Sequence, residues 1–144
     1  MTLKNSKENA TIYLINEQHS GDLSDKIEFT SSGNFYEKEG RFYITYKEHR
    51  SMGMGDSRVF MKIEPGCVTM RRMGEFQTVM VYKEGKTTEF IYNMPFGRLS
   101  MKIKTEKISD GLSADGGELR LSYELFSGGE STLNDIYLRV RLDK

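Results

Sequence analysis

The chain has 144 residues, and its 21 lysines and arginines balance its 21 aspartates and glutamates. A chain of this length buries roughly two-thirds of its unfolded surface in one domain, so it needs neither disulfides nor a structural metal to fold. The balanced charge offers no broad basic field to a phosphate backbone, which argues against nucleic acid as a partner. With Cys67 as its single cysteine, the chain also lacks the thiols for an intramolecular disulfide or a thiolate metal cluster.

The N-terminal residues are polar apart from Met1 and Leu3, so they lack the hydrophobic region of a secretory signal. We expect a flexible tail over residues 1–9 and a single domain over residues 10–144. The longest strongly apolar run, residues 79–82, is far shorter than the ~20 residues that a membrane-spanning helix needs. These features predict a cytoplasmic protein with no membrane partner.

From residue 10 onward, apolar residues recur at almost every second position, which is the pattern of strands that bury one face. Turn residues such as Pro65-Gly66 and Glu84-Gly85 separate these runs at intervals of about 8–12 residues. In chain order, the pattern predicts strands over residues 10–17, 26–36, 41–49, 57–64, 67–73, 77–83, 87–93, 97–107, 117–126 and 131–143.

These strands and the absence of helical periodicity predict an all-β fold. An antiparallel meander that closes into a barrel of about 8–10 strands is favoured, because an open sheet of this width leaves long exposed edges. A β-sandwich is the alternative.

Motifs for catalysis or metal binding are missing from the sequence. The two histidines, His19 and His49, do not have the spacing that places two ligands on one metal. The Gly53–Asp56 loop contains a G-x-G, but it opens a predicted strand and therefore lacks the helix N-terminus that binds phosphate. We predict no catalytic residue, no metal and no cofactor.

Two charged residues fall on the apolar phase of their strands. Glu48 lies two positions after Tyr46, on the face of the strand that we expect to point inward. Arg72 lies two positions after Met70, on the inward face of the strand over residues 67–73. A charge that faces a barrel interior costs several kcal/mol unless it is paired, so in one interpretation Glu48 and Arg72 both point inward and pair with each other. The alternative places both side chains in solvent at the ends of their strands.

The leading hypothesis is a non-catalytic barrel that binds a small hydrophobic, amphipathic or anionic ligand. Arg72 and Glu48 anchor the polar end of the ligand, assisted by the inward hydroxyls of Tyr46, Thr105 and Tyr123. The hypothesis predicts an interior cavity of about a few hundred Å3 or more. The alternative is an interaction or structural module, monomer or homodimer, that uses an exposed strand or the loop over residues 52–56. An enzyme ranks third.

Several segments match a known pattern, and they are Gly33, Tyr43–Glu48, Met52–Asp56, Val68–Glu75 and Tyr92–Gly97. From about Ile27 to the C-terminus, the chain resembles the YwiB-like proteins of Gram-positive bacteria. That family has a calycin-type, lipocalin-like β-barrel and no established function. Its motif Tyr-x-Thr-Pro-Tyr-Gly carries Met94 and Phe96 here in place of threonine and tyrosine.

The resemblance implies the barrel and transfers no activity. Glu48 and Arg72 match family positions whose purpose is unassigned. Calycin barrels often hold small hydrophobic molecules, which is an analogy of fold rather than evidence of a site.

Overall fold

The computed structural model describes residues 8–48 and 56–143, and all regular structure in them is β-strand. There are ten strands: β1 (Ala10–Ser20), β2 (Leu23–Lys38), β3 (Arg41–Glu48), β4 (Ser57–Glu64), β5 (Cys67–Gly74), β6 (Thr78–Lys83), β7 (Thr87–Met94), β8 (Gly97–Ser113), β9 (Gly116–Ser127) and β10 (Glu130–Leu142). Their order in the sheet is β6-β5-β4-β3-β2-β1-β10-β9-β8-β7. None of the described residues forms a helix that could cross a membrane.

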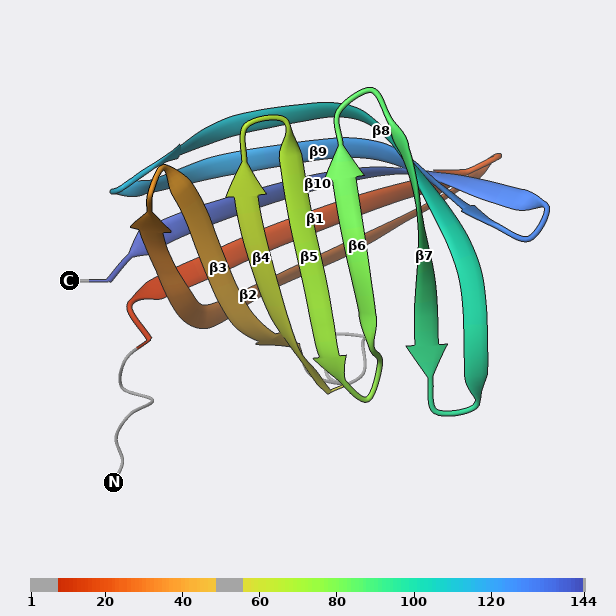
Figure 1. Cartoon of the computed structure of the whole chain (residues 1–144), viewed down its shortest axis with the longest axis horizontal. Coiled ribbons are helices and arrows are strands. Elements are labelled where there is room, and N and C mark those ends of the chain that lie inside the picture. Colours follow the sequence, from red (N-terminus) through yellow and green to blue (C-terminus); the bar gives the residue numbers. More distant parts are fainter. Residues whose placement is uncertain (1–7, 49–55, 144) are drawn as a thin grey trace.

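The sheet folds over into two layers whose strands cross steeply (Figure 1). Strands β3 to β7 form one layer, and β1, β10 and β9 run across behind it. The long strands β2 and β8 belong to both layers. The first part of β2 pairs with β1 as far as Gly33, and from Gly33 onward β2 pairs with β3. The first part of β8 pairs with β7, whereas its second part pairs only with β9.

Both long strands bend where they change layers. In β2 the bend lies at Gly33, where a Cβ atom would lie 2.2 Å from the backbone oxygen of Thr45, so only glycine allows this approach. In β8 a bulge between Thr105 and Lys107 interrupts the register. A bulge kinks its strand and is a common device at a sheet corner.

The barrel is nearly closed where the two end strands of the sheet, β6 and β7, come together. Between β7 and the residue that precedes β6, the described residues form one bridge, Gln77 to Asn93, with two backbone hydrogen bonds of 2.9 Å. Along the rest of this seam, hydroxyl groups donate to backbone oxygens: Thr78 to Ile91 at 3.1 Å and Thr88 to Val81 at 2.5 Å. The predicted all-β antiparallel barrel is confirmed, with this seam as its weakest interface.

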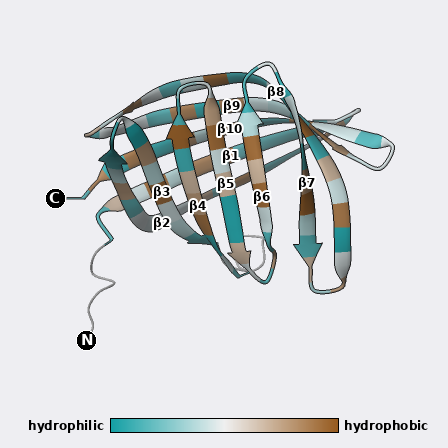
Figure 2. Cartoon of the chain, viewed as in Figure 1, coloured by the Kyte–Doolittle hydropathy of each residue, from teal (hydrophilic) through white to brown (hydrophobic). Residues whose placement is uncertain are grey.

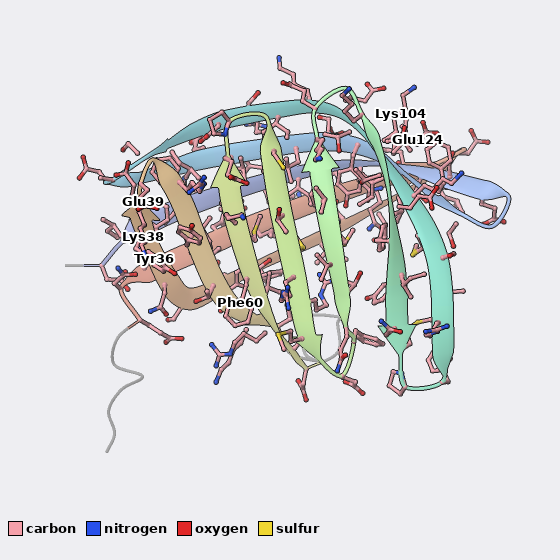
Figure 3. All side chains as sticks on the ribbon, in the orientation of Figure 1. Tyr36, Lys38, Glu39, Phe60, Lys104 and Glu124 are labelled. Atoms are coloured by element: carbon pink, nitrogen blue, oxygen red, sulfur yellow. The ribbon has the colours of Figure 1, made fainter. Side chains whose placement is uncertain are left out.

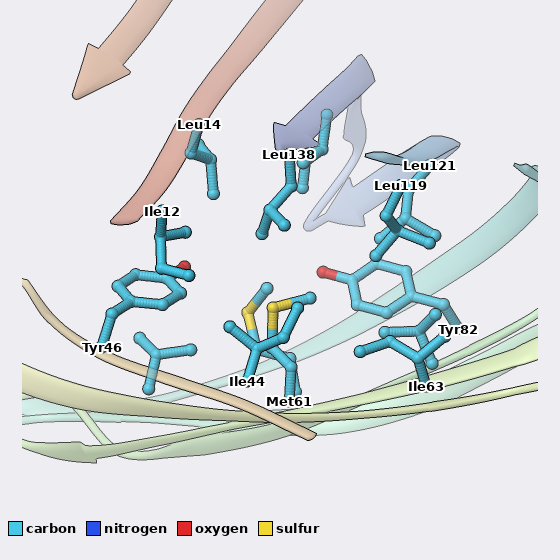
Figure 4. Close-up of a cluster of buried hydrophobic side chains, with 14 of the residues drawn as sticks. Ile12, Leu14, Ile44, Tyr46, Met61, Ile63, Tyr82, Leu119, Leu121 and Leu138 are labelled. Atoms are coloured by element: carbon cyan, nitrogen blue, oxygen red, sulfur yellow. The ribbon is translucent and has the colours of Figure 1, made fainter. Parts of the chain in front are cut away.

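The core fills the space between the two layers. Apolar and polar residues alternate along the strands (Figure 2). Side chains such as Ile12, Leu138 and Leu121 point from the back layer toward Ile44 and Met61 of the front layer (Figure 4). The largest fully buried side chains among the described residues are aliphatic, aromatic or methionine. Burial of these rows is the main source of the stability of the barrel.

Three predicted strands are too short. β1 and β2 continue as a hairpin through polar residues to Ser20 and Leu23, and β8 continues past the bulge to Ser113. The hydrophobic alternation ends before these extensions, although the backbone ladder continues. Residues 1–7 of the predicted tail lie outside the described residues. Asn9 precedes β1 and is held against the sheet by two side-chain hydrogen bonds with the backbone of Phe35, at 2.9 and 2.8 Å.

Candidate functional site

Glu48 and Arg72 form an ion pair inside the barrel. They come from β3 and β5, and the small side chain of Val59 on the intervening β4 lies opposite Arg72 in the sheet. Arg72 donates from Nε to Oε1 of Glu48 at 2.7 Å and from Nη2 to Oε2 at 3.1 Å. Only 2% of Glu48 and 9% of Arg72 are exposed. The predicted pairing is confirmed, and the alternative with both charges in solvent is wrong.

The pairing keeps Arg72 charged in a place that disfavours charge. Burial lowers the pKa of Arg72, but the hydrogen bonds and the negative charge of Glu48 outweigh burial and leave this pKa above its usual value. A bidentate guanidinium–carboxylate contact is among the strongest hydrogen-bonded pairs in proteins. The two charges cancel, so the site presents strong dipoles and little net charge.

The ion pair borders a cavity of about 150 Å3, mostly surrounded by apolar side chains. The residues that line it are Leu14, Asn16, Gln18, Ile27, Phe29, Tyr46, Glu48, Met70, Arg72, Met80, Tyr82, Phe90, Tyr92, Met101, Tyr123, Leu125 and Ile136. The cavity is smaller than the few hundred Å3 that we expected. An apolar cavity of about this volume is known to admit a guest the size of benzene.

Of the three residues whose hydroxyl groups we expected to contact a ligand, two line the cavity and one does not. Tyr46 and Tyr123 line the cavity. Burial raises the pKa of Tyr46, and the charge of Glu48 raises it further, so this phenol stays neutral. Thr105 does not line the cavity, contrary to our expectation. It lies at the bulge of β8, where its Oγ1 is buried without a hydrogen-bond partner.

Comparison with known proteins identifies the family. A family model described as a domain of unknown function (DUF1934) matches residues 12–139. The chain belongs to this family. The uncharacterised β-barrel protein YwiB of Bacillus subtilis (strain 168) is 29% identical over 104 residues, which are 72% of each chain.

The crystal structure of the ywiB protein from Bacillus subtilis has the same fold. It superposes with a TM-score of 0.86 at 23% identity, over 95% of this chain and 93% of that chain. The YwiB-like resemblance inferred from sequence is thereby confirmed. At this identity the structural likeness shows the fold alone, and the relatives assign no ligand or reaction.

Sequence reasoning missed four polar residues of the cavity wall: Tyr82, Tyr92, Asn16 and Gln18. Tyr82 lies in the run over residues 79–82, which is apolar on both faces and therefore hides its inward phase. Asn16 and Gln18 continue the inward row of β1 beyond Leu14. The rule that singled out Glu48, a polar residue on an apolar phase, also finds these two amides.

Other groups with potential chemistry lie apart from the cavity. In the described residues, no three histidine, cysteine or acidic side chains gather into a metal site. Cys67 is a free thiol at the start of β5, and His19 contacts Ser24 Oγ at 3.1 Å on the exposed β1–β2 hairpin. Neither residue lines the cavity. His49 and the loop glycines Gly53 and Gly55 lie outside the described residues.

Proposed function

We propose that this protein is a non-catalytic binding barrel for a small, uncharged amphipathic molecule. The observation that carries the proposal is the buried Glu48–Arg72 pair at the wall of an otherwise largely apolar cavity. Ligand sites typically combine an apolar lining with a few fixed polar groups, and this cavity has that composition. The polar end of the guest contacts the ion pair, and its apolar body lies against residues such as Met80 and Phe90.

The neutrality of the ion pair narrows the proposal. Because Glu48 already neutralises Arg72, an anionic guest would leave a net negative charge in a buried site, and the described residues that line the cavity include no second cation to compensate it. We therefore favour an uncharged guest over the anionic molecule that the sequence also allowed. The part of a guest that lies within this volume has roughly six to eight non-hydrogen atoms, since benzene fits a cavity of this size.

Calorimetric titration tests the proposal with two probes of similar size. Cyclohexanone is uncharged, and cyclohexanecarboxylate is an anion at neutral pH. We expect cyclohexanone to bind the wild-type protein at one site and the carboxylate to bind at least tenfold more weakly. Leu125→Trp places a large side chain in the cavity wall and should abolish binding. Leu133→Trp is the control, because Leu133 is 52% exposed. Absence of binding to the wild type, or equal binding to both tryptophan variants, overturns the proposal.

The alternative of an interaction module has weaker support. Tyr36 and Phe60 are exposed on the outer face of the front layer (Figure 3), but isolated exposed apolar residues are normal on a protein surface. None of the described strands pairs with the outer edge of β8 beyond Thr105. Two carboxylates accept hydrogen bonds from its backbone there: Glu84 from Ile108 N at 3.0 Å and Asp110 from Leu112 N at 3.0 Å. These contacts oppose addition of a strand from a partner.

The cellular location and the oligomeric state that we propose rest on the sequence alone. A cytoplasmic location and a monomeric or homodimeric state stay predictions, and so does the calycin-type classification of the barrel. A cytoplasmic binder of this kind needs no membrane or nucleic-acid partner.

A further inference from the structure

We infer that the guest carries a hydrogen-bond acceptor, most simply a neutral carbonyl group, as its polar end. The inference rests on the proposed function, and it concerns the chemistry that the inward polar groups of the cavity leave unsatisfied. A buried polar group without a partner is costly, so a guest that completes its hydrogen bonds is preferred over one that does not.

Arg72 supplies the first unsatisfied donors. A guanidinium has five N–H donors, and Glu48 accepts two of them, one from Nε and one from Nη2. The remaining three N–H groups have no hydrogen-bond partner in the part of the chain that the structure describes. Because Arg72 lines the cavity and stays charged, these groups can donate strong, charge-assisted hydrogen bonds to a guest.

Tyr46 supplies a second donor. Its side chain is 2% exposed and lines the cavity, and its ring is tilted against that of Phe29 with centroids 5.8 Å apart. Within residues 8–48 and 56–143, its hydroxyl group has no hydrogen-bond partner. The ring contact fixes the phenol on the same wall as the ion pair, two positions before Glu48 on β3.

The acceptors that line the cavity give a guest less than the guanidinium donors do, because Gln18 and Tyr92 each offer one uncharged acceptor oxygen together with a donor. Each carboxylate oxygen of Glu48 already accepts a hydrogen bond from Arg72. Oδ1 of Asn16 has no partner, but it is enclosed by protein atoms and cannot touch a molecule in the cavity. The hydroxyl group of Tyr82 donates to Met80 Sδ at 3.8 Å, and its ring packs edge-on against the ring of Tyr123 with centroids 4.9 Å apart. The polar end of the cavity therefore favours an acceptor on the guest over a donor.

Two isosteric probes test this inference. Cyclohexanone and methylenecyclohexane share a ring and differ in one group, a carbonyl in the first and an exocyclic C=CH2 in the second. We expect methylenecyclohexane to bind at least about tenfold more weakly, because it leaves charged and phenolic donors unpaired. Tyr46→Phe keeps the ring contact with Phe29 and removes one donor, so it should reduce this preference. Tyr36→Phe, at an exposed site on β2, is the control and should leave the preference unchanged.

The outcomes separate this inference from the proposed function. If the two probes bind equally, or the alkene binds more tightly, the acceptor inference is wrong and the binding barrel stands. If neither probe binds the wild-type protein, the proposed function itself fails. The infrared carbonyl stretch of bound cyclohexanone gives a measurement that needs no variant. A stretch at lower frequency than in hexane supports donation from the protein, and an unshifted stretch contradicts it.

Discussion

Two arginine–glutamate pairs of this barrel have nearly the same Nε–Oε distance and opposite surroundings. Nε of Arg72 lies 2.7 Å from Oε1 of Glu48, and Nε of Arg41 lies 2.8 Å from Oε2 of Glu64. The first pair is inside, with side chains 10% and 2% exposed, whereas the second pair is on the outer surface with side chains 44% and 27% exposed. Distance alone therefore cannot tell a structural or functional pair from a surface contact.

The surroundings decide what each pair does. Water screens the exposed pair, so its two charges can separate at little cost. In the low-dielectric interior the two buried charges attract each other more strongly, but both have lost their hydration. Loss of either partner would leave an unpaired charge in an apolar environment. The position of this buried pair beside a cavity is the observation on which the proposed site rests.

Removal of one member of each pair should give the largest difference. We expect Arg72→Ala to lower the free energy of unfolding by about 3–5 kcal/mol, because Glu48 stays buried without a partner. Arg41→Ala should cost about 0–1 kcal/mol. Urea denaturation followed by circular dichroism measures both values.

A double replacement sharpens this comparison. Glu48→Leu combined with Arg72→Met removes both charges and keeps much of the packing, so the double variant should be more stable than either single variant. Equal losses for Arg72→Ala and Arg41→Ala would show that burial does not distinguish the two pairs.

The buried tyrosines extend the comparison to alkaline pH. Burial raises the pKa values of Tyr46, Tyr82 and Tyr123 above the usual value of 10.0. Their contribution to stability is fully present below pH 10 and is lost as the pH rises above it, since only the unfolded chain ionises freely. Each of the three tyrosines should lower the free energy of unfolding by up to ~1.4 kcal/mol per pH unit above pH 10.

Absorbance at 295 nm during alkaline titration measures this effect. Tyr46, Tyr82 and Tyr123 should ionise only as the barrel unfolds, and Tyr46→Phe should remove one group from that late phase. Ionisation of all eight tyrosines in a single step near pH 10, with the barrel still folded, would be incompatible with their burial.

Thr105 gives a smaller effect of opposite sign. Its Oγ1 is buried and has no partner, so Thr105→Val replaces an unsatisfied hydroxyl with a methyl group of similar size. We expect a gain of about 1 kcal/mol in the free energy of unfolding and unchanged binding of cyclohexanone. A loss of binding would return Thr105 to the ligand site that the sequence predicted.

The smallest expected difference between the two ion pairs is the effect of salt on the destabilisation that each arginine-to-alanine change causes. Raising the ionic strength from about 0.1 to 1 M shortens the screening length from about 10 to 3 Å. The destabilisation by Arg41→Ala should then shrink toward zero, whereas that by Arg72→Ala should change little. Equal salt sensitivity of the two variants, measured by urea denaturation, would place both pairs in solvent.

The barrel was predictable because alternation of apolar residues is a local signal. The same signal singled out Glu48 and Arg72 as inward charges, and their pairing follows from the cost of burying either one alone. Other features depend on tertiary structure. Thr105 lies at the bulge of β8 and does not line the cavity, and the size of the cavity depends on how methionine and tyrosine side chains from opposite layers pack. Tyr82 was hidden because both faces of its strand are apolar.

Native mass spectrometry of gently purified protein tests the central claim most directly. The binding barrel predicts that the wild-type protein, in the presence of cyclohexanone, retains one molecule of the ketone and releases it on denaturation, while Leu125→Trp retains none. The claim is contradicted if the folded wild-type protein carries no cyclohexanone at ketone concentrations that saturate cavities of similar volume in calorimetric titrations.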